Sequence, residues 1–128
     1  RTAVVVGGMS EQKQLRQLQR GVQVVIATPG RLGDFLKRRL VKLDQVETVV
    51  LDEADRMLDM GFLPAIEEIL RSAPEQRQTL LFSATIEKSV AHLIEDYVKD
   101  PARVTIGATT KPAEHVDLEH FEVSGNEK

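Results

Sequence analysis

The chain has 128 residues, 41% of them hydrophobic, and no cysteine, so it suits one compact domain and excludes disulfides and thiolate metal sites. Its net charge of −3 argues against a uniformly basic nucleic-acid binder, although the basic side chains predominate in residues 1–50 and the acidic ones in residues 51–128. No apolar run approaches the roughly 20 residues of a membrane span and the start does not resemble a signal peptide, so we expect a cytoplasmic protein without a membrane partner.

Four short runs rich in Val, Leu and Ile predict strands that are buried on both faces of a sheet. Helical patterns alternate with them. In chain order we predict a strand at 3–6, a helix at 11–20, a strand at 22–27, a helix with apolar positions from 32 to 40, a strand at 46–51, a helix with apolar positions from 63 to 70, a strand at 79–82 and a helix with apolar positions from 90 to 97. This alternation predicts an α/β domain with a parallel sheet and flanking helices.

The end of the chain differs in composition from the rest. Asp100-Pro101 ends the last predicted helix, and residues 103–106 predict one more short strand. Residues 107–128 are polar and almost without pattern. We therefore expect one domain over residues 1–106 and a linker over residues 107–128.

A polar loop with unusual residues follows each of the first four predicted strands. In open α/β sheets, ligands bind beyond the carboxyl ends of the strands, so we expect these loops to lie on one edge of the sheet. The four loops are Gly7-Gly8, Thr28-Pro29-Gly30-Arg31, Asp52-Glu53-Ala54-Asp55 and Ser83-Ala84-Thr85.

The acidic loop carries the strongest chemical signal. Packed carboxylates repel one another and lose hydration, so such a cluster usually binds a cation, a proton or a basic partner. An acidic pair at a strand end suits a Mg²⁺-nucleotide site, where one carboxylate holds the metal's water shell and another activates an attacking water. The alternative, acids that cap a helix beside a Ser/Thr turn, does not explain why four loops coincide. The apolar residues that follow fit a core better than ligand contacts: Met57, Leu58, Met60 and Phe62.

The loop after the second strand has the composition of an anion site. Thr28 can cap a helix, Pro29 suits its first turn, and Gly30 lets another backbone approach closely. The resulting helix N-terminus, together with Arg31, would bind an anion. The alternative, an ordinary helix start, accounts for the Thr and Pro better than for the Arg.

Together these residues resemble the DEAD-box family of ATP-dependent RNA helicases, over about residues 1–123. The run from Asp52 to Phe62 is similar to the family's extended Walker B motif, Ser83-Ala84-Thr85 to its motif III, and the two glycine-containing loops to its RNA-contacting elements. The resemblance implies the second half of the first RecA-like domain, a P-loop NTPase fold that here lacks the phosphate-loop strand. It also implies RNA-dependent ATP hydrolysis that drives local unwinding of duplexes.

The resemblance implies a role for each matched residue. Asp52 would hold Mg²⁺ through water, and Glu53 would activate the water that attacks the γ-phosphate of ATP. Asp55 would hydrogen-bond the hydroxyls of Ser83 and Thr85 and so link the nucleotide state to domain closure. The residues implied to contact the RNA backbone, without sequence specificity, are Gly7, Gly8, Thr28, Pro29, Gly30 and Arg31.

Other parts of that machinery are missing from these 128 residues. The chain has no Gly-x-x-x-x-Gly-Lys-Ser/Thr phosphate loop, no adenine-reading motif and no second RecA-like domain with its arginine fingers. Because the chain begins at Arg1 rather than Met, we expect a piece of a longer parent. We expect this piece to be inactive alone, with neither ATP nor Mg²⁺ bound.

Two further expectations concern partners and alternatives. In the family's sheet order the phosphate-loop strand lies beside the strand at 79–82, so its absence leaves an apolar edge open to pairing with a second copy or with a swapped tail. A non-catalytic RNA-binding or protein-interaction module that retains helicase motifs is the alternative function. A DNA-directed relative is disfavoured, because Asp-Glu-Ala-Asp with Ser-Ala-Thr resembles the RNA branch.

Overall fold

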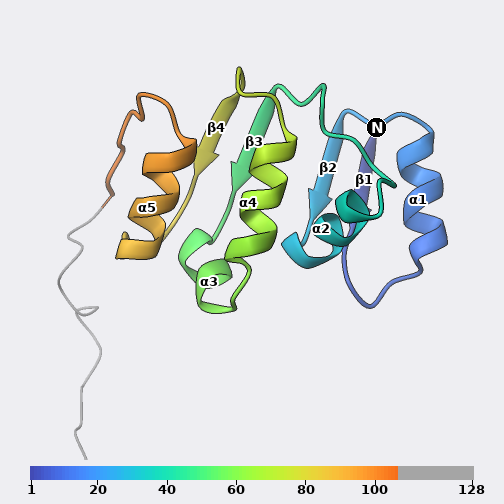
Figure 1. Ribbon diagram of the computed structural model, residues 1–128, viewed down its shortest axis with the longest axis horizontal. Coiled ribbons are helices and arrows are strands. Elements are labelled where there is room, and N and C mark those ends of the chain that lie inside the picture. Colours follow the sequence, from blue (N-terminus) through green and yellow to red (C-terminus); the bar gives the residue numbers. More distant parts are fainter. Residues whose placement is uncertain (107–128) are drawn as a thin grey trace, which may run out of the picture.

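The computed structural model describes residues 1–106. The predicted linker at 107–128 lies outside this range and stays a prediction. The elements are β1 (Thr2–Val5), α1 (Glu11–Gln19), β2 (Val24–Ala27), α2 (Pro29–Lys37), β3 (Thr48–Leu51), α3 (Ala54–Asp59), α4 (Leu63–Ser72), β4 (Gln78–Leu81) and α5 (Lys88–Tyr97) (Figure 1). The short helix α3 was not predicted from the sequence. Within residues 1–106, no helix has the length and apolar character needed to cross a membrane.

The strands pair in parallel, but the pairing does not run through all four. β1 pairs with β2 from Thr2 opposite Val24, and β3 pairs with β4 from Thr48 opposite Gln78. In the part of the chain that the structure describes, no ladder joins β2 to β3, although all four strands point the same way in Figure 1. The prediction of an α/β fold with parallel strands and flanking helices is confirmed, with two strand pairs in place of one continuous sheet.

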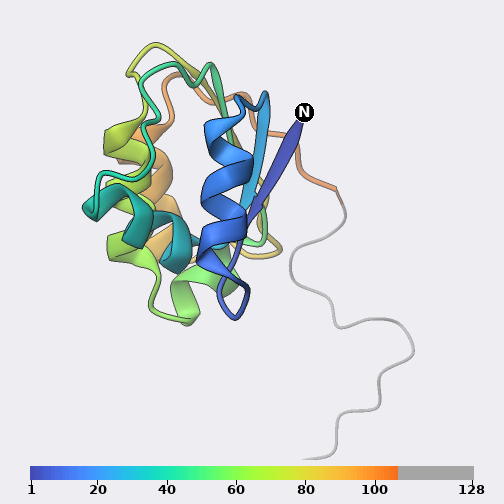
Figure 2. The same ribbon diagram turned by 90° about the vertical axis from the view of Figure 1, so that its right-hand side faces the viewer.

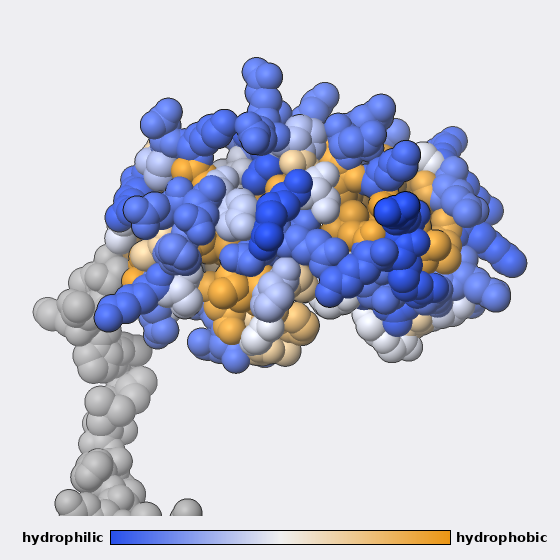
Figure 3. Space-filling model, viewed as in Figure 1, coloured by the Kyte–Doolittle hydropathy of each residue, from blue (hydrophilic) through white to orange (hydrophobic). Residues whose placement is uncertain are grey.

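The helices lie on one side of the strands, as the side view in Figure 2 shows. The face that carries them is predominantly hydrophilic (Figure 3). The opposite face of the strands is apolar and exposed, so the prediction of strands buried on both faces is wrong. No helix of residues 1–106 covers that face. Its exposed residues include Val4, Val24, Ile26 and Val50, at 40%, 52%, 57% and 56% of full exposure.

Residues 103–106 form no strand, contrary to the prediction. Val104 and Ile106 are 87% and 94% exposed. An alternating apolar pattern produces a strand only where a neighbouring strand supplies hydrogen bonds and packing, and among the described residues this segment pairs with none.

The core consists of two clusters that share helix α4. The first lies between the β1–β2 pair and the helices and includes Val5, Phe35 and Ile69. The second lies under the β3–β4 pair and includes Ile66 and Leu70. Because Ile69 belongs to the first cluster and its two helix neighbours to the second, α4 packs against both strand pairs and holds them side by side.

Candidate functional site

The four loops predicted to carry the chemistry all leave the strands at the same edge of the molecule, which is the lower edge in Figure 1. This arrangement follows from the parallel direction of the strands, because parallel strands present their carboxyl ends together. The loops after β1, β2, β3 and β4 therefore lie along one edge of the molecule.

The acidic turn after β3 is fixed at both ends by the neighbouring strand. The N–H of Phe82 donates to the carbonyl of Leu51 at 2.8 Å, and the N–H of Ala54 donates to the carbonyl of Phe82 at 3.0 Å. Leu51 and Ala54 are buried, whereas the two residues between them, Asp52 and Glu53, are exposed. The turn thus projects two carboxylates from a base that is hydrogen-bonded to the neighbouring strand.

Glu53 has a left-handed backbone conformation, with φ 51° and ψ 49°. Residues other than glycine rarely adopt this region, and such conformations gather at functional sites where the surrounding structure enforces them. Here the two hydrogen bonds to Phe82 on either side of the turn enforce it.

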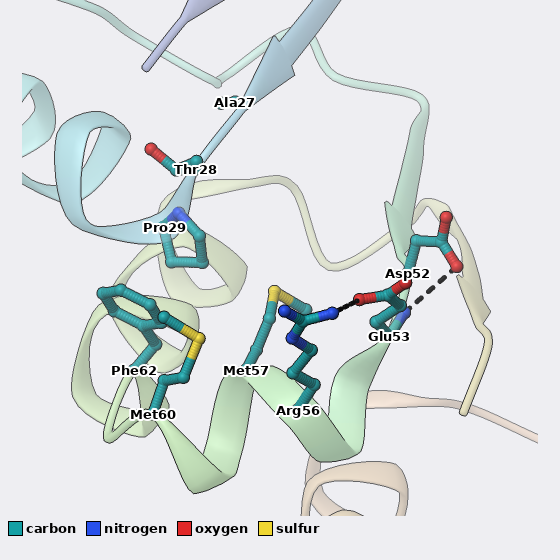
Figure 4. A pocket seen from close by; sticks show the side chains of 9 residues that line it. All are labelled: Ala27, Thr28, Pro29, Asp52, Glu53, Arg56, Met57, Met60 and Phe62. Carbon is teal, nitrogen blue, oxygen red and sulfur yellow. Dashed lines mark hydrogen bonds and ion pairs between the residues drawn. The ribbon is translucent and has the colours of Figure 1, made fainter. Parts of the chain in front are cut away.

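The two carboxylates of the turn have different partners (Figure 4). Glu53 Oε2 lies 3.3 Å from Arg56 Nη1, an ion pair between exposed side chains. Asp52 Oδ1 accepts a hydrogen bond from the N–H of Glu53 at 3.0 Å, and no cation of residues 1–106 pairs with it. Asp52 is therefore the carboxylate of the turn that is open to an external cation.

The described residues do not form a complete metal cage. Within residues 1–106, no group of three or more His, Cys, Asp or Glu side chains is placed to hold a metal ion. Mg²⁺ keeps several of its waters and is commonly bound through one or two carboxylates together with substrate phosphates. The acidic turn fits such a partial, hydrated site.

Asp55 joins the acidic turn to the loop after β4. Its Oδ2 accepts hydrogen bonds from the N–H of Thr85 at 2.9 Å and from the Thr85 hydroxyl at 3.0 Å. Its Oδ1 accepts a bond from the N–H of Arg56 at 2.9 Å. These bonds, first of all the one from the Thr85 backbone, lower the pKa of Asp55 below its usual value.

Ser83 belongs to the same network but binds differently from the expectation. Its hydroxyl accepts a hydrogen bond from the N–H of Asp55 at 3.2 Å and donates to the carbonyl of Thr85 at 2.7 Å. The carboxylate oxygens of Asp55 are already engaged by Thr85 and Arg56. Ser83 therefore stabilises the backbone on both sides of the link.

The loop after β2 begins helix α2 as predicted, with Thr28 at the N-cap and Pro29 in the first turn. The Thr28 side chain makes no capping hydrogen bond, so its hydroxyl is uncommitted. Gly30 has an internal reason to be glycine, because an added Cβ would lie 3.3 Å from the ring of Phe62. Close packing against Phe62, just before α4, thus explains this glycine, and the approach of a ligand backbone is not needed to explain it.

Arg31 has internal partners that the sequence did not reveal. Its Nη1 lies 3.7 Å from Glu11 Oε2, and its guanidinium lies 5.7 Å from the centre of the Phe35 ring. Arg38 donates two hydrogen bonds to the same carboxylate, at 2.7 and 2.8 Å, and these lower the pKa of Glu11. The Arg31 side chain is only 20% exposed, so its charge is held between α1 and α2.

The loop after β1 contains the two predicted glycines in a turn. Gly8 has φ +75°, a conformation that favours glycine. Gly7 has no such requirement, and an added Cβ would meet nothing within 4 Å. Sequence reasoning missed Gln14, whose side chain is buried and bonds to this loop. Its position four residues before Leu18, on the packed side of α1, was the available signal.

An open pocket of about 340 Å³ separates the acidic turn from the loop after β2 (Figure 4). Met57, Leu58 and Phe62 pack against the second core cluster, as predicted. Met60 does not: it is 64% exposed, because the chain turns at Gly61, with φ +79°, and leaves Met60 at the pocket. The lining residues are Ala27, Thr28, Pro29, Asp52, Glu53, Arg56, Met57, Met60 and Phe62.

Comparison with known proteins gives consistent matches. The family model of the DEAD/DEAH box helicases matches residues 1–93. The ATP-dependent RNA helicase RhlB of Pseudomonas syringae pv. tomato is 48% identical over 126 residues, which are 96% of this chain and 32% of that protein. The DEAD-box ATP-dependent RNA helicase CshA of Streptococcus pneumoniae is 46% identical over 124 residues, 97% of this chain and 24% of that protein. The chain thus spans a quarter to a third of these curated relatives.

Solved structures agree with the sequence matches. The yeast DEAD-box splicing factor Prp28 superposes with a TM-score of 0.80 at 37% identity, covering 88% of this chain and 26% of that one. A DEAD box protein from Methanococcus jannaschii gives 0.74 at 36% identity, covering 77% and 27%.

The Asp55 link should make stability depend on pH. We expect Asp55→Asn to lower the free energy of unfolding at neutral pH, because a neutral amide accepts the Thr85 bonds more weakly than a carboxylate. The pKa of Asp55 is lowered in the folded state, so the advantage of the wild type is present above the ordinary pKa of an aspartate and is lost as the pH falls through the lowered pKa. Urea unfolding between pH 7 and pH 3 measures this difference. Asp59→Asn, at the exposed end of α3, is the matched control, and a difference that grows on acidification would contradict the link.

Proposed function

Because this chain belongs to the DEAD/DEAH box helicase family, we propose that it is part of an RNA-dependent ATPase that unwinds RNA duplexes locally. It would supply the acidic motif and part of the RNA-binding surface. The observation that carries the proposal is the acidic turn, in which Asp52 and Glu53 project from two backbone anchors at the carboxyl end of β3.

The chemistry assigns different tasks to the two carboxylates. Asp52, which has no cationic partner within residues 1–106, would hold the water shell of Mg²⁺. A bound Mg²⁺ would neutralise charge on the phosphate oxygens. Glu53 would orient the attacking water and accept its proton, and its ion pair with Arg56 would help to hold the carboxylate in place.

Asp55 would couple this chemistry to movement of a second RecA-like domain. Its bonds to Thr85 cross from the acidic turn to the loop after β4, so a shift of either loop strains the other. Ser83 ties the backbones of both residues together. Such a short, charge-assisted network is suited to transmit a change of nucleotide state.

The RNA contacts would come from the loops after β1 and β2. Gly7 is glycine although neither its φ angle nor any internal neighbour requires it, which favours close approach of an external backbone. The Thr28 hydroxyl is free of capping bonds, next to the amides of the α2 N-terminus. Helix N-termini bind phosphates through such groups, and contacts of this kind read the backbone rather than the base sequence. Pro29, Gly30 and Arg31 would shape and charge this surface.

ATP turnover would require a phosphate loop in addition to these residues. The 128 residues contain no Gly-x-x-x-x-Gly-Lys sequence, so we propose that the chain alone neither binds ATP usefully nor hydrolyses it. The same feature favours the second candidate, a non-catalytic RNA-binding or interaction module. An ATPase assay with and without RNA on the complete protein decides between the two.

We also propose a cytoplasmic location, which the lack of cysteine favours.

We further propose that residues 107–128 lead toward the second RecA-like domain.

We also propose that the isolated chain self-associates through the free edge of β4. Within residues 1–106, β4 pairs with β3 alone, and Phe82 beyond its end is 53% exposed. An unpaired strand edge is a template for another chain. Light scattering on the 128-residue chain should show a fraction of dimer that increases with protein concentration. A monomer at every concentration would contradict this.

Glu53→Gln tests the base. We expect turnover of ATP by the complete protein to fall by about 10²- to 10⁴-fold, because the amide cannot accept the proton, while ATP binding is retained. Steady-state kinetics and nucleotide titration measure the two effects. Glu75→Gln, at an exposed position before β4, is the control. Unchanged turnover in Glu53→Gln would remove Glu53 from the mechanism.

Arg31→Ala tests the phosphate surface. We expect weaker RNA binding, with the slope of log affinity against log salt reduced by about one unit, because one cationic contact is lost. RNA titrations at several salt concentrations measure the slope. Arg71→Ala removes a guanidinium that is also ion-paired but lies at the end of α4, away from the four loops, and should leave the slope unchanged. An unaltered slope in Arg31→Ala would exclude the phosphate contact.

A further inference from the structure

Gln14 is the one polar side chain that is buried in residues 1–106, with 2% exposure. Helix α1 carries three other glutamines, Gln12, Gln17 and Gln19, and all of them are exposed. A buried amide must satisfy its hydrogen-bonding groups inside the protein. The hydrogen-bond partners of the Gln14 amide therefore indicate why a polar residue is buried at this position.

The amide of Gln14 binds the loop that contains Gly7 and Gly8. Its Oε1 accepts a hydrogen bond from the N–H of Val6 at 3.1 Å. Its Nε2 donates to the carbonyl of Val6 at 3.0 Å and to the carbonyl of Met9 at 3.3 Å. The side chain thus pairs with Val6 as a neighbouring strand would, one residue beyond the end of β1.

These bonds enclose the two glycines. Val6 precedes them and Met9 follows them, so one side chain fixes both ends of the turn. The turn itself is exposed, and glycine is the residue with the most conformational freedom to lose on ordering. Without the Gln14 bonds, the segment would have to be ordered by the ligand, at the expense of affinity.

Helix α1 also contacts the second loop of the proposed RNA surface. Glu11, three residues before Gln14, forms the ion pair with Arg31. The start of the second loop is also tied to the end of β1, because the N–H of Thr28 donates to the carbonyl of Val5 at 3.0 Å. α1 is therefore the element against which both loops are oriented.

We infer that Gln14 is a positioning residue, which holds the Gly7-Gly8 turn in the conformation that receives an RNA phosphate. This inference rests on the RNA contact proposed above. Gln14 does not touch the RNA, since it is buried beneath the turn. It acts by fixing the main-chain groups of the turn before the RNA arrives, so that little ordering remains to be done on binding.

The test replaces Gln14 by Met, which has a similar length and volume but forms no comparable hydrogen bonds. In the complete protein, we expect hydrogen exchange at the Val6 amide to accelerate about tenfold, because its bond to Gln14 Oε1 is lost. We expect the RNA dissociation constant to rise about tenfold for loss of the ordered turn. The turnover number at saturating RNA and ATP should stay within about twofold, since the reacting groups are untouched.

Gln17→Met, an exposed glutamine of the same helix, is the matched control and should change none of the three quantities. Gln14→Glu is a second variant, which keeps an acceptor for the Val6 N–H but loses the donors to the carbonyls of Val6 and Met9. We expect weaker RNA binding, with a smaller acceleration of exchange at the Val6 amide than in Gln14→Met. A folded Gln14→Met or Gln14→Glu protein with wild-type exchange and wild-type RNA affinity would overturn the inference. A lowered turnover number at saturating RNA, in proportion to the unfolded fraction, would also overturn it in favour of a purely structural role.

The exchange measurement requires no RNA, so the proposed RNA contact and the positioning role of Gln14 can be tested separately. If the wild-type protein does not bind RNA, the proposed function is wrong, whatever the exchange data show. If the wild type binds RNA and Gln14→Met binds it equally well with faster exchange at the Val6 amide, the positioning inference alone is wrong.

Discussion

The packing of α4 in both core clusters sets the two strand pairs side by side and so places the four loops along one edge. In the described part of the chain, no hydrogen-bonded ladder connects β2 to β3, so main-chain pairing does not set the distance between the loop after β2 and the acidic turn. Side chains set it instead, through Ile69 in one core cluster and Ile66 and Leu70 in the other. The pocket between the two loops is lined by residues of both loops and of the segment that leads into α4 (Figure 4).

The periodicity of the sequence was sufficient for the order of the four strands and of four of the helices, and for the edge on which the loops gather. It missed the short helix α3 and predicted a strand at 103–106 that does not form. The sequence does not reveal that one face of the strands is exposed. A run of Val and Ile without polar residues looks the same whether the second face of the strand is covered or exposed. Ile26 and Val50 illustrate this ambiguity, since both are strand residues that were predicted to be buried and are more than half exposed. Covering a face depends on helices, and residues 1–106 place theirs on the other side.

The chemistry of the site was predictable where neighbouring residues determine it, and unpredictable where distant ones do. Asp52 and Glu53 follow directly from the strand end. The pairing of Arg31 with Glu11 joins residues of two helices, and the role of Gln14 depends on a turn that precedes its helix. From periodicity alone, a polar residue on the packed face of a helix is only an exception to the apolar pattern. The three-dimensional structure shows that Gln14 binds the loop after β1.

The backbone of Glu53 places two demands on one position. A left-handed conformation costs a non-glycine residue about 1 to 2 kcal/mol, so the fold alone would be more stable with glycine there. A glycine would remove the carboxylate that faces Arg56. The acidic turn is thus a position where selection for stability and selection for activity oppose each other, and stabilising substitutions at this residue should be expected to impair the protein they stabilise.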